Sequence, residues 1–231
     1  MFTVLLTDGE FTGLIRTLRD AYNGNVRIVG LSSDPYFAHQ SLLDSYHIVP
    51  RHNDPSYIDT LIAIVKMEKA EIIFPIVTEG LEDLLANEQR IMFETGAKII
   101  SSPYPAIRTA NDKGLLYSFI SEHSSGLADI IPLYHFADSK KQLFEAMKQI
   151  EAKGRITCIK RRRGENAAGF WIIDDTADYA SFLFNESPSR FISKSVLSSM
   201  LQKLGGDEAI APYMAVEYLP GEAWYCDVLG M

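Results

Sequence analysis

The chain has 231 residues, which is enough for one large domain or two smaller ones. Its 47% apolar and 23% charged residues can build a full core and exclude a disordered chain. The formal net charge of -8 argues against nucleic acid as the main partner, because phosphate backbones favour basic surfaces.

Strand and helix signals alternate through the first hundred residues. Short apolar runs at residues 4–6, 26–31, 46–50, 71–75 and 98–101 predict strands. Apolar residues at helical spacing predict helices over residues 11–22 and 54–69 and one amphipathic helix that includes Leu81 to Met92. Asp54 and Pro55 indicate the start of the second helix, with a capping carboxylate followed by proline at the first helical position. This alternation predicts an open parallel α/β layer over residues 1–105.

The second half has a different rhythm. Helices are predicted at residues 113–122, 139–152 and 195–204, and strands at 155–160, 170–173, 211–218 and 223–229. Phe182 and Phe184 are expected core aromatics, and Gly205–Gly206 is the expected end of the last helix. Prolines at 103 and 105 interrupt the pattern between the halves. We therefore expect a second, mixed α+β domain over residues 106–231.

The sequence predicts neither a metal site nor a membrane segment. Cys158 and Cys226 are the two cysteines, which make no disulfide framework, and the five histidines form no ligand pair. The N-terminus lacks a basic region, and no run of about 18 apolar residues exists. We expect a soluble, cytoplasmic protein of a reducing compartment, with no membrane and no nucleic acid among its partners.

A dinucleotide site in the first turn is disfavoured. Gly9 and Gly13 lack the G-x-G-x-x-G spacing, and Asp8 and Glu10 would repel a pyrophosphate. Two further turns, Asp34–Pro35 and residues 78–80, follow predicted parallel strands, where ligands of such sheets bind. Turn and cap chemistry explains both, and we favour that reading over a substrate role.

A basic run follows one predicted strand of the second half. Strand alternation places Cys158 and Lys160 on one face of a largely apolar sheet, where an ammonium needs an anion. Arg161, Arg162 and Arg163 come next, and Gly164 opens a loop that ends at Gly169 and offers free N–H groups to an anion. A solvated surface loop is the competing interpretation of such a run.

Two other segments carry candidate binding groups. Lys113 follows Asn111–Asp112 and begins a helix, so it is either a second phosphate-binding cation or an exposed lysine behind a helix cap. Residues 217–219 are an extended segment whose C=O and N–H groups can pair with the edge of an adenine, beside the apolar wall of Leu219. An ordinary hairpin ending at Pro220–Gly221 explains the same residues.

Taken in order, these motifs resemble the ATP-grasp family, and most of all the large chain of carbamoyl-phosphate synthase. The resemblance covers nearly the whole chain and is carried by residues 46–50 and 72–75 of a pre-ATP-grasp domain, by Asn111–Lys113, by Ile159–Lys160 with Arg162–Gly164 and Gly169, and by residues 216–222. The resemblance implies an ATP site made of Lys113, Lys160, Arg162, Arg163, Gly164, Gly169, Glu217, Tyr218, Leu219 and Glu222. It names no catalytic residue.

The resemblance implies an ATP-dependent ligase that forms C–N bonds. ATP phosphorylates a carboxylate or bicarbonate, and ammonia or an amine attacks the acyl phosphate. Fixed charges position the phosphates, with Mg²⁺ as the expected metal. The expected partners are a small carboxylate and an amine.

The chain departs from the family pattern at several positions. Arg161 replaces a common proline, Asn166 replaces a loop glycine, and Glu222–Ala223 replaces a pair of acids of which the second contacts ribose. The family's magnesium ligands normally lie beyond the position that corresponds to Met231. We therefore expect an incomplete ATP-grasp domain: a fragment, a truncated product or one part of a split enzyme. A homodimer or a missing C-terminal half would cover its open sheet edge.

Two other function classes compete with the ligase. One is a nucleotide-binding or regulatory module without ligase activity, which would bind ATP without turnover. The other is a Rossmann oxidoreductase, which would bind a nicotinamide cofactor rather than ATP.

Overall fold

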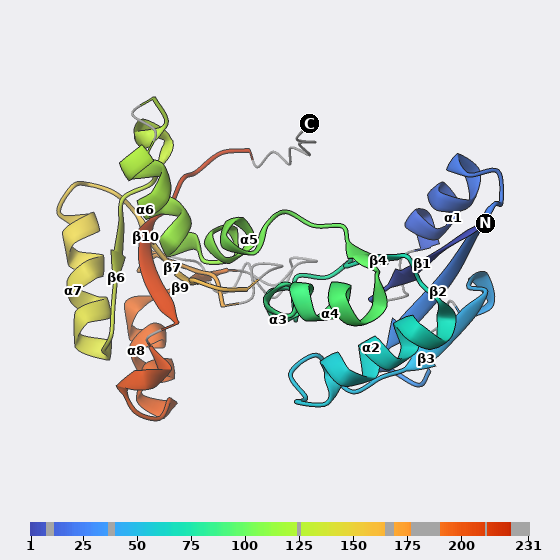
Figure 1. Ribbon diagram of the computed structural model, residues 1–231. Coiled ribbons are helices and arrows are strands. Elements are labelled where there is room, and N and C mark those ends of the chain that lie inside the picture. Colours follow the sequence, from blue (N-terminus) through green and yellow to red (C-terminus); the bar gives the residue numbers. More distant parts are fainter. Residues whose placement is uncertain are drawn as a thin grey trace. The chain divides into compact units, whose positions relative to one another are not determined.

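The chain divides into two compact units, each with its own sheet. The computed structural model describes residues 1–7, 12–36, 40–123, 126–164, 169–176, 190–210 and 212–222. The first unit is residues 1–108 and the second is residues 109–231 (Figure 1). Helix α5 (Tyr104–Ala110) contains the point of division, where the sequence predicts only an interruption.

The first unit is built on a five-stranded, all-parallel sheet. Its strand order across the sheet is β3 (Ser45–Ile48), β2 (Val26–Ser32), β1 (Phe2–Leu6), β4 (Ile72–Phe74) and β5 (Lys98–Ile99). The helices between the strands are α1 (Thr12–Ala21), the single turn η1 (Gln40–Leu42), α2 (Tyr57–Glu68), α3 (Leu81–Ala86) and α4 (Glu88–Thr95). The predicted parallel α/β layer is confirmed, because alternating strands and helices pair in parallel through crossovers.

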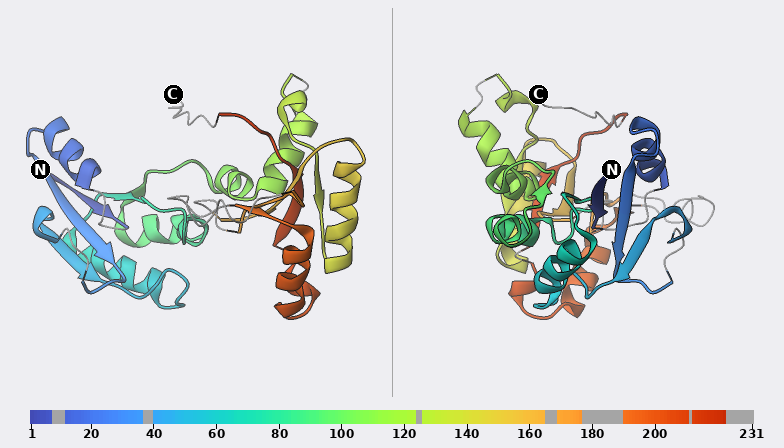
Figure 2. Two further views of the ribbon diagram at one scale, coloured as in Figure 1. Left: turned by 180° about the vertical axis from the view of Figure 1, so that it is seen from behind. Right: turned by 45° about the vertical axis from the view of Figure 1, so that its right-hand side comes forward.

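Both faces of this sheet are buried, as a parallel sheet requires. Leu6 and Ile28 lie on the face that α1 covers through Ile15. Leu5 and Val29 lie on the opposite face, which packs against α2, α3 and α4 (Figure 2). Neighbouring residues of one strand thus enter two separate cores, which explains why the strands are continuously apolar.

Two predictions in the first unit are wrong in detail. Asp54 accepts hydrogen bonds from Ser56 N–H and Ser56 Oγ, at 2.8 and 2.7 Å, and α2 begins only at Tyr57, so Pro55 is not its first residue. The single helix expected around residues 81–92 is two, divided at Asn87, whose Nδ2 donates to the Asp83 carbonyl oxygen at 2.8 Å. Asn87 has a φ of -101° and a ψ of 8°, outside the helical range, and this backbone conformation separates the two helices. Met92, one of the apolar residues that indicated this helix, is 51% exposed.

Local hydrogen bonds and backbone conformation explain the two turns at Asp34–Pro35 and residues 78–80, which follow parallel strands. Asp34 Oδ1 accepts the Tyr36 N–H at 2.8 Å, which is a local Asx turn. Gly80 precedes α3 with φ of 73°, and a Cβ there would lie 2.5 Å from Cβ of His52. Backbone conformation and close approach explain that glycine without a ligand.

The second unit holds a five-stranded mixed sheet. Its order is β6 (Tyr134–Phe136), β10 (Tyr213–Glu217), β7 (Thr157–Arg161), β8 (Trp171–Ile173) and β9 (Phe191–Ile192), antiparallel except for the parallel β8–β9 pair. The other elements are α6 (Lys113–His123), η2 (Ala128–Ile130), α7 (Lys140–Glu151), α8 (Lys194–Lys203) and η4 (Asp207–Ala209). Strands β6 and β9 are not predicted from the sequence, because runs of three and two residues carry no readable alternation.

The two faces of this second sheet differ in what covers them. Helices α7 and α8 pack on one face over a buried core that includes Ile159 and Ala215 (Figure 2). Cys158 and Val216 point to the other face, which meets Tyr117 of α6. We call this second surface the α6 face; Tyr134, Phe170, Phe191 and Tyr218 are partly buried on it.

Some predictions fall outside the described residues. These are the first turn at residues 8–11, the loop residue Asn166, the aromatics Phe182 and Phe184, and the strand at 223–229 with Cys226. Among the residues that are described, no helix has both the length and the hydropathy to cross a membrane. The predicted end of α8 is also shifted, since Leu204 in an extended conformation follows its last residue.

Candidate functional site

Lys160 lies on the α6 face of the sheet, as strand alternation predicts. Its Nζ donates to the Tyr117 hydroxyl at 3.0 Å and lies 5.4 Å from the centre of that ring. The neighbouring Cys158 is buried, and burial raises the pKa of its thiol to about 11, an effect that the Lys160 charge opposes. The strand therefore presents a cation beside apolar groups, and Tyr117 connects this cation to α6.

Lys113 is the first residue of α6, and it contacts the loop that follows β7. Its Nζ donates to the carbonyl oxygens of Gly164, at 2.9 Å, and Arg162, at 3.5 Å. Its backbone N–H also donates to the Arg162 carbonyl, at 3.0 Å. Burial lowers the pKa of the Lys113 ammonium, the positive charge of Lys160 lowers it further, and Asp112 opposes the change. The two lysines, 47 residues apart in the sequence, are thus electrostatic neighbours.

A buried carboxylate organises this corner of the second unit. Asp112 Oδ1 accepts the N–H groups of Gly114, at 2.9 Å, and Leu115, at 3.2 Å, and so caps α6. The same carboxylate pairs with Arg162, whose Nε and Nη2 donate at 3.1 and 2.9 Å, and lies 3.5 Å from Arg163 Nε. Burial would raise the pKa of Asp112, but these donors and the Arg162 charge hold it below its ordinary value.

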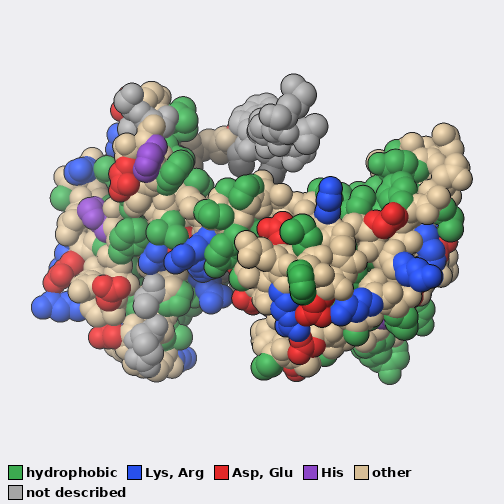
Figure 3. Space-filling view, viewed as in Figure 1, with side chains coloured by type: hydrophobic (Ala, Val, Ile, Leu, Met, Phe, Trp, Pro, Cys, Tyr) green, Lys and Arg blue, Asp and Glu red, His purple; other side chains and the backbone are tan. Residues whose placement is uncertain are grey.

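Arg162 and Arg163 are predicted ATP ligands, and here their side chains meet Asp112. Lysine and arginine side chains gather beside hydrophobic ones on the face of the second unit shown in Figure 3. Asp112 is the residue whose importance the sequence hides. From the sequence it is interpreted as an ordinary helix cap. Its position directly before Lys113, together with the four consecutive cations at residues 160–163, could have indicated an ion pair.

Gly114 allows the close packing of this corner. A Cβ at this position would lie 2.4 Å from Cε1 and 2.7 Å from Cζ of Phe136, and 3.1 Å from Nε of Arg162. Arg162 in turn lies over the Phe136 ring, 4.7 Å from its centre. The α6 helix therefore approaches β6 closely only because this side chain is missing.

The two loop glycines have different surroundings. Gly164 has a φ of 131°, and a Cβ there would meet no described atom within 4 Å, so its conformation rather than close packing favours glycine. Gly169 has a φ of 70°, and a Cβ there would lie 2.8 Å from Cγ of Arg161 and 3.3 Å from Cε1 of Tyr213. Arg161 alternates with Lys160, so its side chain belongs to the sheet face opposite the α6 face.

The predicted adenine edge lies at the end of β10. The Glu217 carboxylate pairs with Arg155 Nε at 3.2 Å and accepts the Leu133 N–H at 3.3 Å, so its role is structural. The N–H of Tyr218 donates to the Ile156 carbonyl at 2.8 Å. Leu219 is 59% exposed, and Glu222 is also exposed. Among the described contacts, the Glu217 carbonyl receives only the weak Cys158 thiol, at 3.9 Å.

The structure thus connects Lys113, Lys160, Arg162, Arg163 and Gly164 through direct contacts or neighbouring charges. It places Glu217 at the end of β10, which pairs with β7, and Tyr218 directly after it. It gives Glu222 no contact with the lysines among the described residues. No group of three His, Cys, Asp or Glu side chains in the described ranges is arranged to hold a metal ion. An apolar cavity of about 310 Å³ lies on the α7–α8 face of the sheet, not on the face that holds Lys160.

Residues 4–100 match a protein family described as PylC-like, N-terminal domain. No curated protein sequence matches the chain significantly. Solved structures do match: an ADP complex of N5-carboxyaminoimidazole ribonucleotide synthetase has a TM-score of 0.61 and 13% identity, over 95% of this chain and 47% of that one. The synthetase from Staphylococcus aureus complexed with ADP gives 0.61 and 11%, over 94% and 47%.

The biotin carboxylase domain of Hydrogenobacter thermophilus 2-oxoglutarate carboxylase, in complex with MgADP, ADP and bicarbonate, has a TM-score of 0.55 and 16% identity. That match covers 94% of this chain and 44% of the other. The chain has the ATP-grasp fold. It spans about half the length of the ATP-grasp structures that it resembles. The first unit corresponds to the matched N-terminal family, and the second unit continues the fold.

Proposed function

We propose that this chain is part of an ATP-dependent ligase of the ATP-grasp type, acting in the cytoplasm, in which its second unit holds the nucleotide. The proposal rests on one observation: Lys113 begins α6, and Lys160 of β7 donates to Tyr117 of the same helix, so α6 gathers two cations from separate segments. Among the described residues, neither has a carboxylate within ion-pair distance. The ADP complexes of the two synthetases with this fold support a nucleotide as the ligand.

Two neighbouring ammonium groups repel each other unless an anion lies between them. A polyphosphate supplies several negative oxygens and is long enough to meet both cations. The purine is then proposed to lie at the end of β10, where the Glu217 carbonyl and the Leu219 N–H offer an acceptor and a donor. Tyr218 N–H already bonds to Ile156, so it is excluded from this role.

The proposed reaction is carbamoyl-phosphate synthase-like. A carboxylate or bicarbonate oxygen attacks the γ-phosphorus of ATP, and the bond from that phosphorus to the bridging oxygen of ADP breaks. The resulting acyl phosphate is attacked at its carbonyl carbon by ammonia or an amine. Inorganic phosphate leaves, and the nitrogen loses a proton. This chain's share is to hold the phosphates in place by fixed charge.

Mg²⁺ is proposed as the metal on the phosphates, but the described residues do not fit it. Hard cations such as Mg²⁺ take carboxylate and carbonyl oxygens, and the one buried carboxylate at this site, Asp112, is taken by Arg162 and the α6 cap. We therefore assign no metal ligand to these residues and derive no step through the metal.

Binding is tested by calorimetric titration of the 231-residue chain with ATP. A charged hydrogen bond contributes roughly 1.5–3 kcal/mol, so Lys160→Ala is expected to weaken binding by about 10- to 100-fold. Lys113→Ala should act in the same direction. Lys148→Ala on α7 removes an exposed lysine and should bind like the wild type. If both site variants bind ATP as well as this control, the assignment is wrong.

A nucleotide-binding or regulatory module without ligase activity is the second candidate, because the cations that would hold a nucleotide are described whereas no catalytic group is assigned. Turnover separates the two. ADP release is measured with bicarbonate and pools of small carboxylates and amines, on the longest natural chain that contains these residues. Binding without ADP release in every pool would support the module and refute the ligase.

A further inference from the structure

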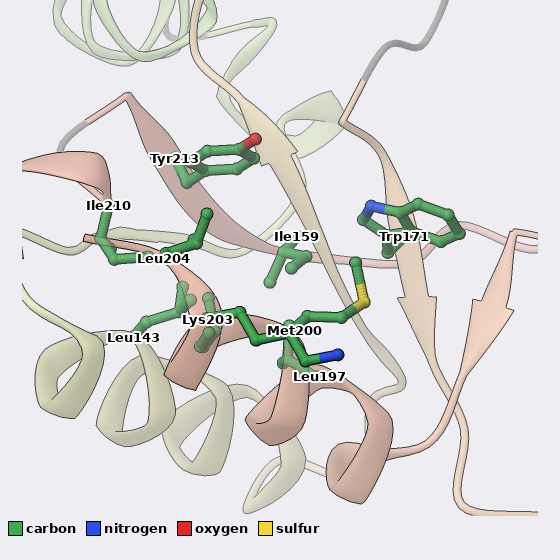
Figure 4. A pocket seen from close by; sticks show the side chains of 10 residues that line it. Leu143, Ile159, Trp171, Leu197, Met200, Lys203, Leu204, Ile210 and Tyr213 are labelled. Atoms are coloured by element: carbon green, nitrogen blue, oxygen red, sulfur yellow. The ribbon is translucent and has the colours of Figure 1, made fainter.

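The second unit carries a cavity that the nucleotide site does not use. It lies on the α7–α8 face (Figure 4). Its volume is about 310 Å³. Its walls come from three strands and two helices and are mainly apolar; they include Ile159, Trp171, Met200 and Tyr213. Ile159 and Lys160 are adjacent in β7 and point to opposite faces, so the cavity and the two lysines lie on different sides of one sheet.

One cation belongs to this cavity. Lys203, in the last turn of α8, lines it and is exposed. A lysine in this position often bonds the free carbonyls at its helix end. Here Lys140 does so instead, donating to the carbonyl oxygens of Leu204, at 3.3 Å, and Gly205, at 2.9 Å. Within the described part of the chain, no carboxylate pairs with Lys203.

A second cation lies beside the cavity. Arg161 belongs to the same sheet face, and its guanidinium carbon is 5.9 Å from the centre of the Tyr213 ring that lines the wall. The nearby carboxylate of Asp207 accepts the backbone N–H of Lys140 at 3.1 Å. The cavity thus combines apolar walls with cations at its edge, in the size range of small-molecule sites.

We propose that this cavity binds a small amphipathic anion, namely a carboxylate with an aliphatic or aromatic body of about ten heavy atoms. The apolar body fills the space under α8, and the carboxylate meets Lys203 at the rim. A nucleotide does not fit this description, because the walls offer few partners for a triphosphate. The alternative is a dry packing gap, which would accept an apolar body without preferring an anion.

The cavity contains its own reporter. The chain has two tryptophans, Trp171 and Trp224, so Trp224→Phe leaves only the indole that lines the cavity. In this background, the intrinsic fluorescence is titrated with decanoate and with decan-1-ol below their aggregation limits. We expect a saturable change with both, and about 10-fold tighter binding of decanoate, because only the carboxylate gains a charged contact.

Two variants test the geometry. Lys203→Gln should bring the affinity for decanoate down to that for decanol, whereas Lys148→Gln on α7 should preserve the difference. Leu204→Phe at the partly exposed mouth, checked for its fold by circular dichroism, should weaken both ligands. Saturating ATP should leave decanoate affinity unchanged, since it is proposed to bind the other face. No saturable signal, or equal affinity for decanoate and decanol in the wild-type cavity, overturns the proposal.

Discussion

Asp112 offers the sharpest test of the energetics of the site, because two substitutions separate its two roles. Asp112→Asn keeps an oxygen for the N–H groups of Gly114 and Leu115 but removes the charge opposite Arg162. The Asp112 side chain is 7% exposed and that of Arg162 is 30% exposed, so water replaces only part of the lost interaction. A hydrogen bond to a charged group contributes about 1.5–3 kcal/mol, and we expect a loss near the lower end, about 1.5–2 kcal/mol.

Asp112→Ala removes the helix cap as well and should cost about 1 kcal/mol more. Urea unfolding at neutral pH measures both differences. The exposed Asp129 supplies the control, since Asp129→Asn should stay within about 0.5 kcal/mol of the wild type. An Asn variant as stable as the wild type, or an Ala variant no less stable than the Asn variant, would refute this division of roles.

The pH dependence of the same pair follows from the lowered pKa of Asp112. A carboxyl group whose pKa is lower in the folded than in the unfolded state adds stability above its unfolded pKa, about 3.9. This contribution is lost as the pH falls through the folded-state pKa. The advantage of the wild type over Asp112→Asn should therefore shrink below about pH 4. An advantage that stays constant into strong acid would mean that the charge of Asp112 contributes nothing.

Three further outcomes are expected. Gly114→Ala should destabilise the chain by about 1–2 kcal/mol in urea unfolding, because the added methyl group meets the phenyl ring of Phe136. The control Gly13→Ala in α1, with open space around it, should be neutral or stabilising. Equal effects of the two substitutions would exclude the steric argument. Burial would raise the pKa of Glu68, but hydrogen bonds donated by Ser45, His47 and Arg27 outweigh it and lower this pKa from 4.5 to about 2. Glu68→Gln should therefore lower the free energy of unfolding by on the order of 3 kcal/mol at neutral pH, and by progressively less from about pH 5 to pH 2. A loss of stability that does not depend on pH would contradict this linkage. In a Cys226→Ser background, Cys158 is the only thiol left. It is buried and has a pKa of about 11, so it should react with iodoacetamide at pH 8 only after unfolding. Rapid labelling of the folded chain would show that the α6 face is open at Cys158.

The fold class could be predicted because its signals are local and repeated. Continuous apolar strands such as β2, alternating with amphipathic helices, permit few arrangements other than a parallel layer. The predictions that were wrong concern features that depend on single residues or on tertiary pairing. Asn87 divides a helix whose apolar spacing runs on without interruption, because its backbone leaves the helical conformation. Strands β6 and β9 exist only because longer neighbours pair with them.

The contacts around the candidate site could not be predicted from the sequence. Lys160 could be placed on its face from strand alternation alone. Its hydroxyl partner, Tyr117, is 43 residues away in the sequence, and no pattern in the chain joins them. The pairing of Asp112 with Arg162, across 50 residues, is equally invisible in a sequence read by periods and motifs. These contacts arise from tertiary packing, and they decide which cations face a ligand and which face the protein.

The bond from Lys113 to the Gly164 carbonyl has a consequence for ligand capture. The ammonium has three N–H donors, and the carbonyls of Gly164 and Arg162 take two of them, so a phosphate that uses more than the third must displace an internal ligand. The measured dissociation constant would then exceed the intrinsic one by the reciprocal of the fraction of molecules in which this bond is open. A substitution that weakens this internal bond without touching a phosphate would then tighten nucleotide binding.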